Sequence, residues 1–572
     1  MRARSGRGGY IDAVSQTPSE TPPADATSTP GNSDVAGPET VAPESATSAA
    51  DNALAAEIRV GYAFTGPAIQ FGAAVVDGVT HPEARVQIPL AVMNRHGLVA
   101  GATGTGKTKT LQLMAEQLSG NGVPVFLADI KGDLSGLATA GTSNARIDAR
   151  THDIGQEWVG TAYPTEFLSL GGLGTGTPIR ATITSFGPTL LSKVLGLNET
   201  QESSLGLVFH YADQRGLALL DLKDLRAVIS FLNSDEGKVE LKDLGGLSKA
   251  TAGVILRELI AFEDQGADVF FGEPEFDTRD LLRTATDGKG VVTVLELPAV
   301  QDRPALFSTF LMWLLADLFH DLPEVGDLDK PKLVFFFDEA HLLFDGASKA
   351  FVDAIQQTVR LIRSKGVGVF FVTQSPKDVP NDVLAQLGNR VQHALRAFTP
   401  DDAKALRAAV STYPHTAYDL EKLLTQLGTG QAVITVLSET GAPTPVAWTM
   451  MRAPQSLMGP SDEALVKQLV ASSPLTGKYA VALDRESAYE ILQKRLQQAP
   501  AAPTQAPAPS APAPPQDARH EAPAPRRAER EDPGLVQSVV KSSAFKSMLR
   551  SAGTVIGREI TRSIFGTARR SR

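Results

Sequence analysis

Short apolar runs alternate with stretches of helical spacing from residue 97 onward. Each run holds three to seven residues, which suits strands buried in a parallel sheet. The runs are residues 98–100, 123–129, 291–297, 333–337, 367–373 and 432–437. Alternation of strands and helices predicts an α/β domain built around a mainly parallel sheet.

Two helical regions interrupt these strands. After the first run, one helical face carries Leu111, Met114, Ala115 and Leu118, and the sequence Ser-Gly-Asn-Gly at 119–122 ends that helix. Between about residues 186 and 285 the strand rhythm stops and apolar residues keep helical spacing, starting from Leu190 and Leu191. We expect a helical insertion there, between strands of the sheet.

Composition changes toward both ends of the chain. The first residues are rich in Pro, Ser, Thr and Ala without hydrophobic period, which indicates disorder. Short β-like runs at 68–71 and 86–89 predict a small β element ahead of the main sheet. The expected domains are a disordered segment 1–56, a folded core 57–460, a helical extension 461–496, a Pro/Ala-rich linker 497–533 and a basic amphipathic tail 534–572.

Charge and cysteine content exclude several classes of site. The formal charge is −10, which argues against a surface coated in positive charge but leaves room for a local basic channel. Without cysteine, a disulfide framework, a cysteine-bound zinc and an iron–sulfur cluster are excluded, so we expect no metal cluster. No secretory signal follows Met1, and the most apolar stretch, 310–316, is too short to cross a bilayer. We expect a cytoplasmic protein.

A glycine-rich turn joins the first apolar run to the helix after it. Residues 101–108 read Gly-Ala-Thr-Gly-Thr-Gly-Lys-Thr, the whole P-loop pattern in its strand–turn–helix context. The lysine would hold the β- and γ-phosphates and the last threonine would face Mg²⁺. A chance glycine-rich turn rarely matches the complete pattern. We therefore predict that ATP and Mg²⁺ bind at Gly101, Ala102, Thr103, Gly104, Thr105, Gly106, Lys107, Thr108 and Lys109.

Two acids end the apolar run at 333–337. Ionised carboxylates are costly to bury unpaired, so Asp338 and Glu339 need a partner or a function. Asp338 fits a direct or water-mediated contact to Mg²⁺, and Glu339 fits the base that orients the attacking water. The alternative is a surface loop that merely starts with two acids. The P-loop upstream favours the catalytic interpretation, with Lys107 as a further catalytic residue.

Weaker candidates lie on the elements that follow. Gln374 ends the run at 367–373, where an amide could sense the γ-phosphate or be an ordinary polar residue. Arg360 and Arg363 come late on the preceding helical stretch and could stabilise transition-state charge or lie on a solvated face. Asp129 and Asp133 follow another strand end and fit either a role near Mg²⁺ or an Asx-type turn.

Several ordered motifs resemble the HerA/FtsK superfamily of ring ATPases, in particular the HerA-like branch typified by the YjgR protein. They cover roughly residues 85 to 460. The matching stretches are 94–97 with the P-loop, Ala-Asp-Ile-Lys-Gly-Asp-Leu at 128–134, Phe-Asp-Glu-Ala-His at 337–341, 363–376, and the run 387–400.

This resemblance implies a RecA-like P-loop fold and a homo-oligomeric ring, expected to be a hexamer, with nucleotide between subunits. It also implies that Arg363, Arg390 or Arg396 reaches a neighbour's γ-phosphate. Relatives move along or unwind duplex DNA, so a DNA translocase or helicase-like motor is the leading expectation. The short N-terminal β region, the helical insertion and the basic tail depart from the family pattern.

Two other interpretations of the sequence compete with this one. Residues 338–341 also match a string of superfamily 2 helicases, but they lie 231 residues after Lys107 and no second RecA lobe with its arginine motif follows. A different class of function is an ATP-dependent assembly or switch protein that acts on protein partners. A basic central pore would favour the motor, and a neutral or acidic pore the switch.

The C-terminal residues form a separate candidate surface. From 541 to 572 there are eight bases and one acid. Ile556, Ile560 and Ile564 recur every fourth residue, so one helical face is apolar and the rest is charged. Such a helix fits DNA phosphates, an anionic membrane, or another surface of the protein. The Pro/Ala linker would let the tail reach away from the ring.

Overall fold

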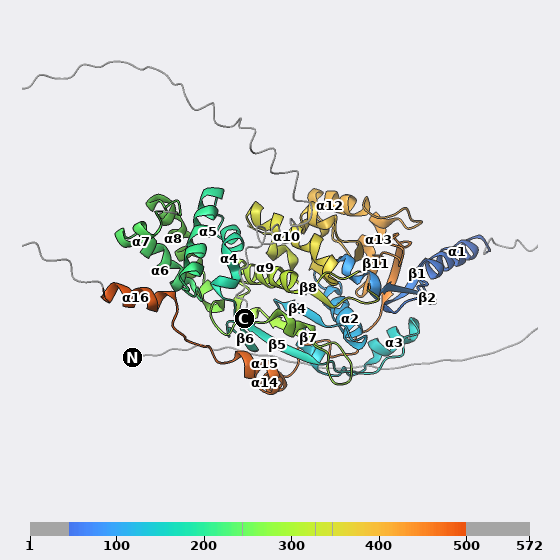
Figure 1. The fold of residues 1–572 in the computed structure, drawn as a ribbon. Coiled ribbons are helices and arrows are strands. Elements are labelled where there is room, and N and C mark those ends of the chain that lie inside the picture. The colour runs from blue at the N-terminus through green and yellow to red at the C-terminus, as the bar shows by residue number, and fades with distance from the viewer. Residues whose placement is uncertain (1–44, 243, 327, 346, 499–572) are drawn as a thin grey trace, which may run out of the picture. The chain divides into compact units, whose positions relative to one another are not determined.

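One twelve-stranded sheet organises the part of the chain that the structure describes (Figure 1). The computed structural model describes residues 45–498, apart from 243, 327 and 346, and the described residues from Ala50 onward belong to one compact unit. The strand order is β2-β1-β12-β11-β10-β3-β9-β8-β4-β7-β5-β6. The strands are β1 (Ala68–Val76), β2 (Val79–Pro89), β3 (Gly97–Ala100), β4 (Val125–Asp129), β5 (Thr165–Leu170), β6 (Thr177–Ile179), β7 (Val292–Glu296), β8 (Leu333–Phe337), β9 (Val367–Thr373), β10 (Asn389–Gln392), β11 (Gln431–Thr435) and β12 (Ala447–Met451).

The predicted α/β class with a mainly parallel sheet is confirmed. All neighbours from β10 through β3, β9, β8, β4, β7 and β5 to β6 run parallel. The prediction that residues 432–437 form a parallel strand is wrong, because β11 pairs antiparallel with both β10 and β12. An apolar run indicates burial on both faces, but it carries no information about strand direction.

The predicted β element ahead of the core is part of the core's own sheet. Strands β1 and β2 form a hairpin through Asp77 and Gly78, which both have positive φ, as a two-residue hairpin turn requires. Strand β1 then pairs with β12, and Gly72 lies opposite Met451. A Cβ on Gly72 would lie 1.9 Å from the Met450 carbonyl oxygen, so glycine permits this close approach.

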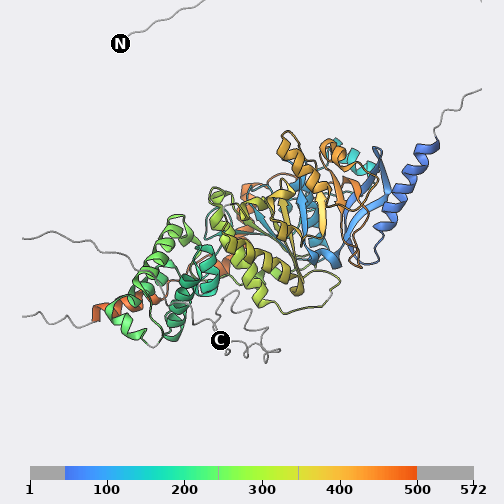
Figure 2. The ribbon, with the colours of Figure 1, turned by 90° about the horizontal axis from the view of Figure 1, so that it is seen from above.

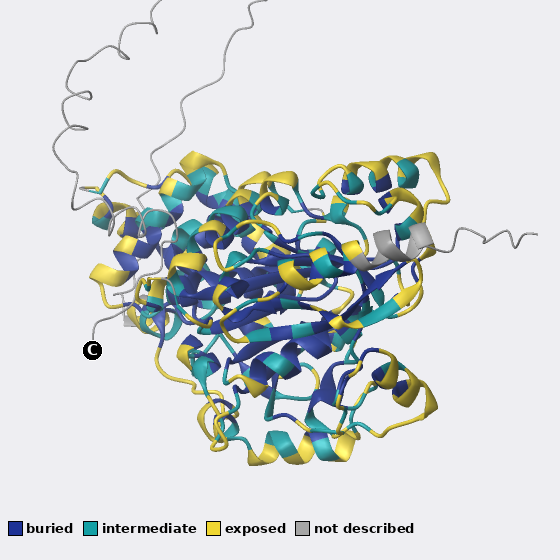
Figure 3. Ribbon diagram, turned by 90° about the vertical axis from the view of Figure 1, so that its right-hand side faces the viewer, coloured by how far each residue is buried: buried dark blue, intermediate teal, exposed yellow. Residues whose placement is uncertain are grey.

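Helices cover both faces of the sheet, and the strand residues between them are buried (Figure 3). On β8, Phe335 and Phe337 pack in one cluster with α9 and α10, whereas Val334 and Phe336 pack in the cluster that contains α2. The helices are α1 (Ser45–Gly61), α2 (Lys107–Gly120), α3 (Ala145–Asp153), α4 (Ile183–Val194), α5 (Glu199–Gln214), α6 (Leu222–Leu232), α7 (Asp235–Glu240), α8 (Lys249–Asp264), α9 (Pro304–Asp321), α10 (Lys349–Ile362), α11 (Asn381–Leu384), α12 (Pro400–Val410), α13 (Leu420–Gln426), α14 (Glu463–Ser472), α15 (Pro474–Tyr479) and α16 (Ala488–Gln498).

The stretch expected as a helical insertion contains α5 to α8 and most of α4 (Figure 2). The expected helical extension contains α14, α15 and α16, and it returns to this lobe. The Tyr489 backbone N–H donates to the Asp224 carboxylate over 2.9 Å, which fastens α16 to α6. Near β6, the hydroxyls of Thr177 and Thr476 lie 2.7 Å apart. Residues 461–498 therefore connect the helical lobe to the β6 end of the sheet.

The chain ends fall largely outside the described residues. Residues 1–44 of the predicted disordered segment lie outside the described residues, and so do all but the first two residues of the predicted linker and the whole basic tail. Residues 45–56 differ from the prediction, because they belong to α1, where Ala55 and Ile58 are buried. An alanine-rich sequence without a clear amphipathic period hid this helix. None of the helices described here is long and apolar enough to cross a membrane.

Candidate nucleotide-binding site

The predicted P-loop lies between the ends of β9 and β10. The Gly101 N–H donates to the Thr373 carbonyl over 3.2 Å, and the Ala102 N–H donates to the Ala394 carbonyl over 2.8 Å. Within the loop, the Thr105 hydroxyl donates to the Ala102 carbonyl over 2.7 Å. These bonds fix the loop to the same strand ends that carry the other candidate residues.

The local backbone is suited to a phosphate group. At Gly101, a Cβ would lie 2.5 Å from the Cβ of His393, so this position has no room for a side chain. At Gly104, φ is 79°, a conformation that favours glycine, and no heavy atom lies within 4 Å of an added Cβ. Helix α2 begins directly afterwards, and its first N–H groups lack acceptors within the helix. The loop thus offers N–H donors and open space together.

Lys107 opens α2 with a side chain that points back over the loop. Its Nζ donates to the Ala102 carbonyl over 3.2 Å, and the residue is only 7% exposed. Burial lowers its pKa, and the carboxylate of Glu339 opposes that shift. Thr108 is half-buried next to it, and the Lys109 Nζ donates to the Gln112 side chain over 3.1 Å. The residues present fit the triphosphate that the sequence predicts.

Two residues that the sequence did not single out, His393 and Arg150, support the P-loop. The ring of His393 is buried. Its Nε2 lies 2.8 Å from the Thr110 Oγ1, and its Nδ1 lies 2.8 Å from the Gln431 carbonyl oxygen. Because a carbonyl only accepts, Nδ1 carries the proton and Nε2 accepts from the hydroxyl. Burial lowers the His393 pKa to about 4, so the ring is neutral at neutral pH.

Arg150, on α3, supports the loop indirectly. Its guanidinium donates to the carbonyls of Thr429, Gly430 and Met451 over 3.1, 2.9 and 3.1 Å. The Gly430 N–H in turn donates to the Thr105 carbonyl of the P-loop over 3.0 Å. No sequence signal relates Arg150 to a carbonyl 280 positions away, so only the fold reveals this support.

Asp338 lies at the end of β8, 3% exposed. Its Oδ2 is buried without a hydrogen-bond partner among the described residues. Burial raises its pKa to about 7, and the ammonium of Lys131 opposes the shift. A buried oxygen without a donor is suited to a cation or a cation-bound water. No group of three or more candidate side chains in the described residues could hold a metal alone, so an ion here would need other ligands such as phosphate oxygens.

Both carboxylate oxygens of Glu339 are engaged. Oε1 accepts from the Lys131 Nζ, while Oε2 lies 3.5 Å from the Gln374 Nε2 and 3.3 Å from the His341 Nδ1. The backbone of Glu339 is left-handed, with φ and ψ both 47°, which is uncommon for a residue with a side chain. The structure thus brings the Gln374 side chain to Glu339.

The sequence leaves two roles open for Asp129, an Asx-type turn or a place near Mg²⁺, and the structure shows the turn. Its carboxylate accepts the backbone N–H groups of Lys131, Gly132 and Leu134 over 3.1, 2.8 and 2.8 Å. Asp133 keeps a buried Oδ1 without a hydrogen-bond partner among the described residues. Sequence reasoning singled out these two acids and passed over Lys131 between them, which is the residue that contacts Glu339.

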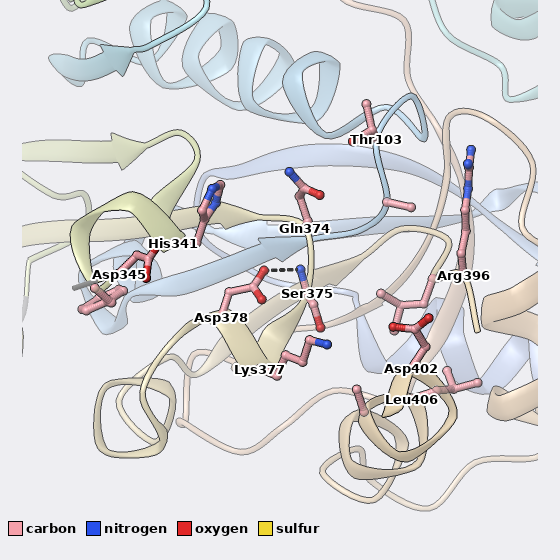
Figure 4. Close-up of a pocket in the computed structure, with 14 residues that line it drawn as sticks. Thr103, His341, Asp345, Gln374, Ser375, Lys377, Asp378, Arg396, Asp402 and Leu406 are labelled. Atoms are coloured by element: carbon pink, nitrogen blue, oxygen red, sulfur yellow. Dashed lines mark hydrogen bonds between the residues drawn. The ribbon is translucent and has the colours of Figure 1, made fainter. Parts of the chain in front are cut away.

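A cleft of about 700 Å³ opens beside the P-loop (Figure 4). Ala102, Thr103, Gln374 and Arg396 line it, and Arg396 comes from the segment after β10. Arg396 is therefore the candidate arginine that shares a cleft with its own P-loop.

The other two candidate arginines lie elsewhere. Arg390 is on β10, and its guanidinium donates to the Thr412 hydroxyl. Arg363 follows α10 and precedes β9, so it lies at the opposite ends of the strands from the P-loop, with its side chain exposed. The structure brings Lys107, Asp338, Glu339 and Gln374 to the P-loop end of the sheet, and Arg396 lines the cleft there with Gln374. Arg363 lies at the opposite end of the strands.

A partly buried acid near this site should make stability depend on pH. Glu296 ends β7 in register with Asp129, and burial raises its pKa from 4.5 to about 8, with the Asp129 charge adding to the shift. The unfolded chain loses this proton near pH 4.5 and the folded chain only near 8, so stability falls as the pH rises through that window. Glu296→Gln is expected to flatten this fall and to stabilise the protein at pH 8, on the order of 1–3 kcal/mol. Thermal unfolding without nucleotide at several pH values measures the effect, and parallel curves for both proteins would contradict it.

Two known proteins are similar in sequence to parts of this chain. The chain is 23% identical over 366 residues to the DNA double-strand break repair helicase HerA of Sulfurisphaera tokodaii, covering 62% of this chain and 64% of that protein. It is 31% identical over 153 residues to the probable helicase MJECL08 of Methanocaldococcus jannaschii, covering 25% of this chain and 28% of that protein. The chain thus spans less than two thirds of the length of either relative.

Among solved structures, the plasmid coupling protein TrwB in complex with the non-hydrolysable ATP analogue ADPNP is similar, with 17% identity and a TM-score of 0.45. The alignment covers 70% of this chain and 99% of that chain. The sequence model of the family described as "Helicase HerA-like C-terminal" matches residues 75–572. This match extends over most of the chain, which therefore belongs to the HerA-like helicase C-terminal family.

Proposed function

We propose that this protein is an ATP-hydrolysing ring ATPase that works as a motor on DNA. The observation that carries the proposal is the meeting of Lys107, Asp338 and Glu339 at the ends of β3 and β8. A P-loop lysine, a buried acid with a free oxygen and a second carboxylate are the groups that phosphoryl transfer to water needs.

Each residue has a distinct part in hydrolysis. Lys107 and the backbone N–H groups of the P-loop bind the phosphates, and Thr108 and Asp338 would hold Mg²⁺, which neutralises phosphate charge. Glu339 takes a proton from the attacking water while the bond between the β- and γ-phosphates breaks, giving ADP and phosphate. The Gln374 amide, next to Glu339, orients that carboxylate or the water.

DNA as the polymer rests on the family and on its relatives. The relative from Sulfurisphaera tokodaii is named as a helicase of DNA double-strand break repair. Ring formation rests on the same family membership and on the exposed Arg363, which lies away from its own P-loop. The acidic net charge of the whole chain requires that a DNA path be locally basic.

The test is the ATPase rate with no polymer, duplex DNA, single-stranded DNA and RNA. Lys107→Ala serves as the inactive reference, and Lys422→Ala, an exposed cation on α13, serves as the matched control. We expect hydrolysis that depends on Lys107 and rises several-fold with duplex DNA. Hydrolysis that no nucleic acid changes would contradict the DNA motor and favour an assembly or switch protein acting on protein partners.

A further inference from the structure

We propose that Arg150 is a positioning residue for nucleotide binding, and that it sets the affinity for ATP by fixing the P-loop through the turn at 428–430. The proposal rests on the proposed ATPase function and adds to it a residue outside the P-loop and the catalytic acids. Among the described residues, the hydrogen bonds of Arg150 go to the carbonyls of Thr429, Gly430 and Met451 and to the Met450 sulfur. Arg150 therefore acts on the P-loop through this turn and the end of β12.

The turn packs directly behind the phosphate-binding loop. The Gly430 N–H donates to the Thr105 carbonyl over 3.0 Å. A Cβ on Gly106 would lie 3.3 Å from the Gly430 nitrogen, so the two backbones are in contact. The Thr105 carbonyl and the Gly106 N–H belong to one planar trans peptide and point in opposite directions. The bond behind the loop thus fixes the direction of a P-loop N–H that is suited to phosphate.

The turn depends on Arg150 because its own backbone is permissive. Gly428 and Gly430 flank Thr429, and glycine has the most backbone freedom to lose. Gly430 has a φ of 75°, and a Cβ there would lie 3.0 Å from the Arg150 Nη1, so glycine also allows the guanidinium to approach. A guanidinium presents several N–H donors in one rigid plane. One side chain therefore holds the carbonyls of two successive residues, Thr429 and Gly430.

The segment between β4 and β5 brings Arg150 to this turn. In the sheet, four strands lie between β4 and β11, and one of them is β3, which leads into the P-loop. Residues 130–164 nevertheless extend to β11 and β12 and place α3 beside them. The connection thus carries a cation from one side of the P-loop strand to the other.

This segment is anchored on both sides of α3. The N–H groups of Gly141 and Thr161 both donate to the Gln455 carbonyl, each over 2.9 Å. The Gln156 side chain donates to the Ala453 carbonyl and accepts from the Ala453 N–H, also over 2.9 Å each. The backbone around α3 is therefore held in place, and it presents Arg150 to the turn from a fixed point.

The experiment measures the Kd of ADP with Mg²⁺ by calorimetry and the KM for ATP. In Arg150→Met we expect both constants to rise about 10-fold, the size of one hydrogen bond from a charged donor. The kcat at saturating ATP should stay within about two-fold, because the P-loop holds the phosphates alike in the ground state and the transition state. Arg150→Lys keeps the charge and loses the planar fork, so we expect a rise of about three-fold. Arg146→Met, exposed on the same helix, is the matched control and should bind as the wild type.

Gly430→Ala changes the same turn and leaves Arg150 in place. The added Cβ is strained at this φ and crowds the guanidinium, so Kd and KM should rise here too. The two changes together should raise Kd by less than the product of the single effects, because both act through one turn. Effects that multiply would overturn the proposal. Should Arg150→Met fail to fold, Arg150→Lys and Gly430→Ala provide the same test.

Two further results would overturn the proposal. A lower melting temperature without nucleotide, with Kd and KM unchanged, would leave Arg150 a purely structural role. A lower kcat with KM unchanged would place its effect on the chemical step instead of on binding.

Failure of the proposed function gives a different pattern. If ADP and ATP bind the wild type no better than Lys107→Ala, the nucleotide site itself is wrong and the role of Arg150 falls with it. Hydrolysis that DNA does not change would contradict the motor, while the affinities of Arg150→Met and the wild type would still decide this proposal.

Discussion

Replacing Glu339 by glutamine is expected to slow ATP turnover by about 100-fold or more, because general-base catalysis contributes on that scale. The amide keeps the size of the side chain and its contact to Gln374, but it cannot take a proton from water. Lys107 and the P-loop backbone are unchanged, so ATP should still bind.

The measurement is a steady-state ATPase assay together with the shift in melting temperature on adding ATP and Mg²⁺. Glu421→Gln makes the same chemical change on an exposed face of α13 and should behave as the wild type. A Glu339→Gln protein that hydrolyses ATP at the wild-type rate would contradict the role of Glu339. Loss of the ATP-dependent shift would instead indicate that Glu339 is needed for binding.

Strands of the core were predictable because their sequence signals are local. Residues 333–337 and 367–373 coincide with β8 and β9, since each is a continuous apolar run bounded by polar residues or glycine. The P-loop and the acids at 338 and 339 could be placed in the same way, because each directly follows a strand. Parallel strands place their carboxyl ends at one edge of the sheet.

Contacts between distant segments were not predictable in this way. Strand β10 is four residues long and contains Asn389 and Arg390, so it lacks an apolar run. Arg150 on α3 and Lys131 in a turn look like ordinary surface cations in sequence. Their partners are carbonyls and a carboxylate more than 200 positions away, and only the folded sheet brings them together.

The second large expected effect is on kcat, and it follows from the position of Arg363 in the fold. Arg363 precedes β9, whose seven residues span about 20 Å before the chain reaches the P-loop end of the sheet. That distance exceeds the length of one arginine side chain, so Arg363 cannot serve its own site. In a ring it would act on a neighbour, and loss of such an arginine lowers kcat by roughly 1,000-fold or more. Arg396 lines the same cleft as its own P-loop and would act within one subunit.

Mixing two inactive variants separates these roles. A mixture of Lys107→Ala and Arg363→Ala should regain about a quarter of wild-type ATPase activity, because random assembly pairs an intact P-loop with an intact neighbouring arginine at that frequency. A mixture of Lys107→Ala and Arg396→Ala should stay inactive, since no subunit then has both groups in one cleft. Arg360→Ala, on α10 three residues before Arg363, is the matched control and should be active alone. Recovery with Arg396→Ala but not with Arg363→Ala would reverse the assignment. A fully active monomer in sedimentation would rule out shared sites, because hydrolysis would then need no neighbouring subunit.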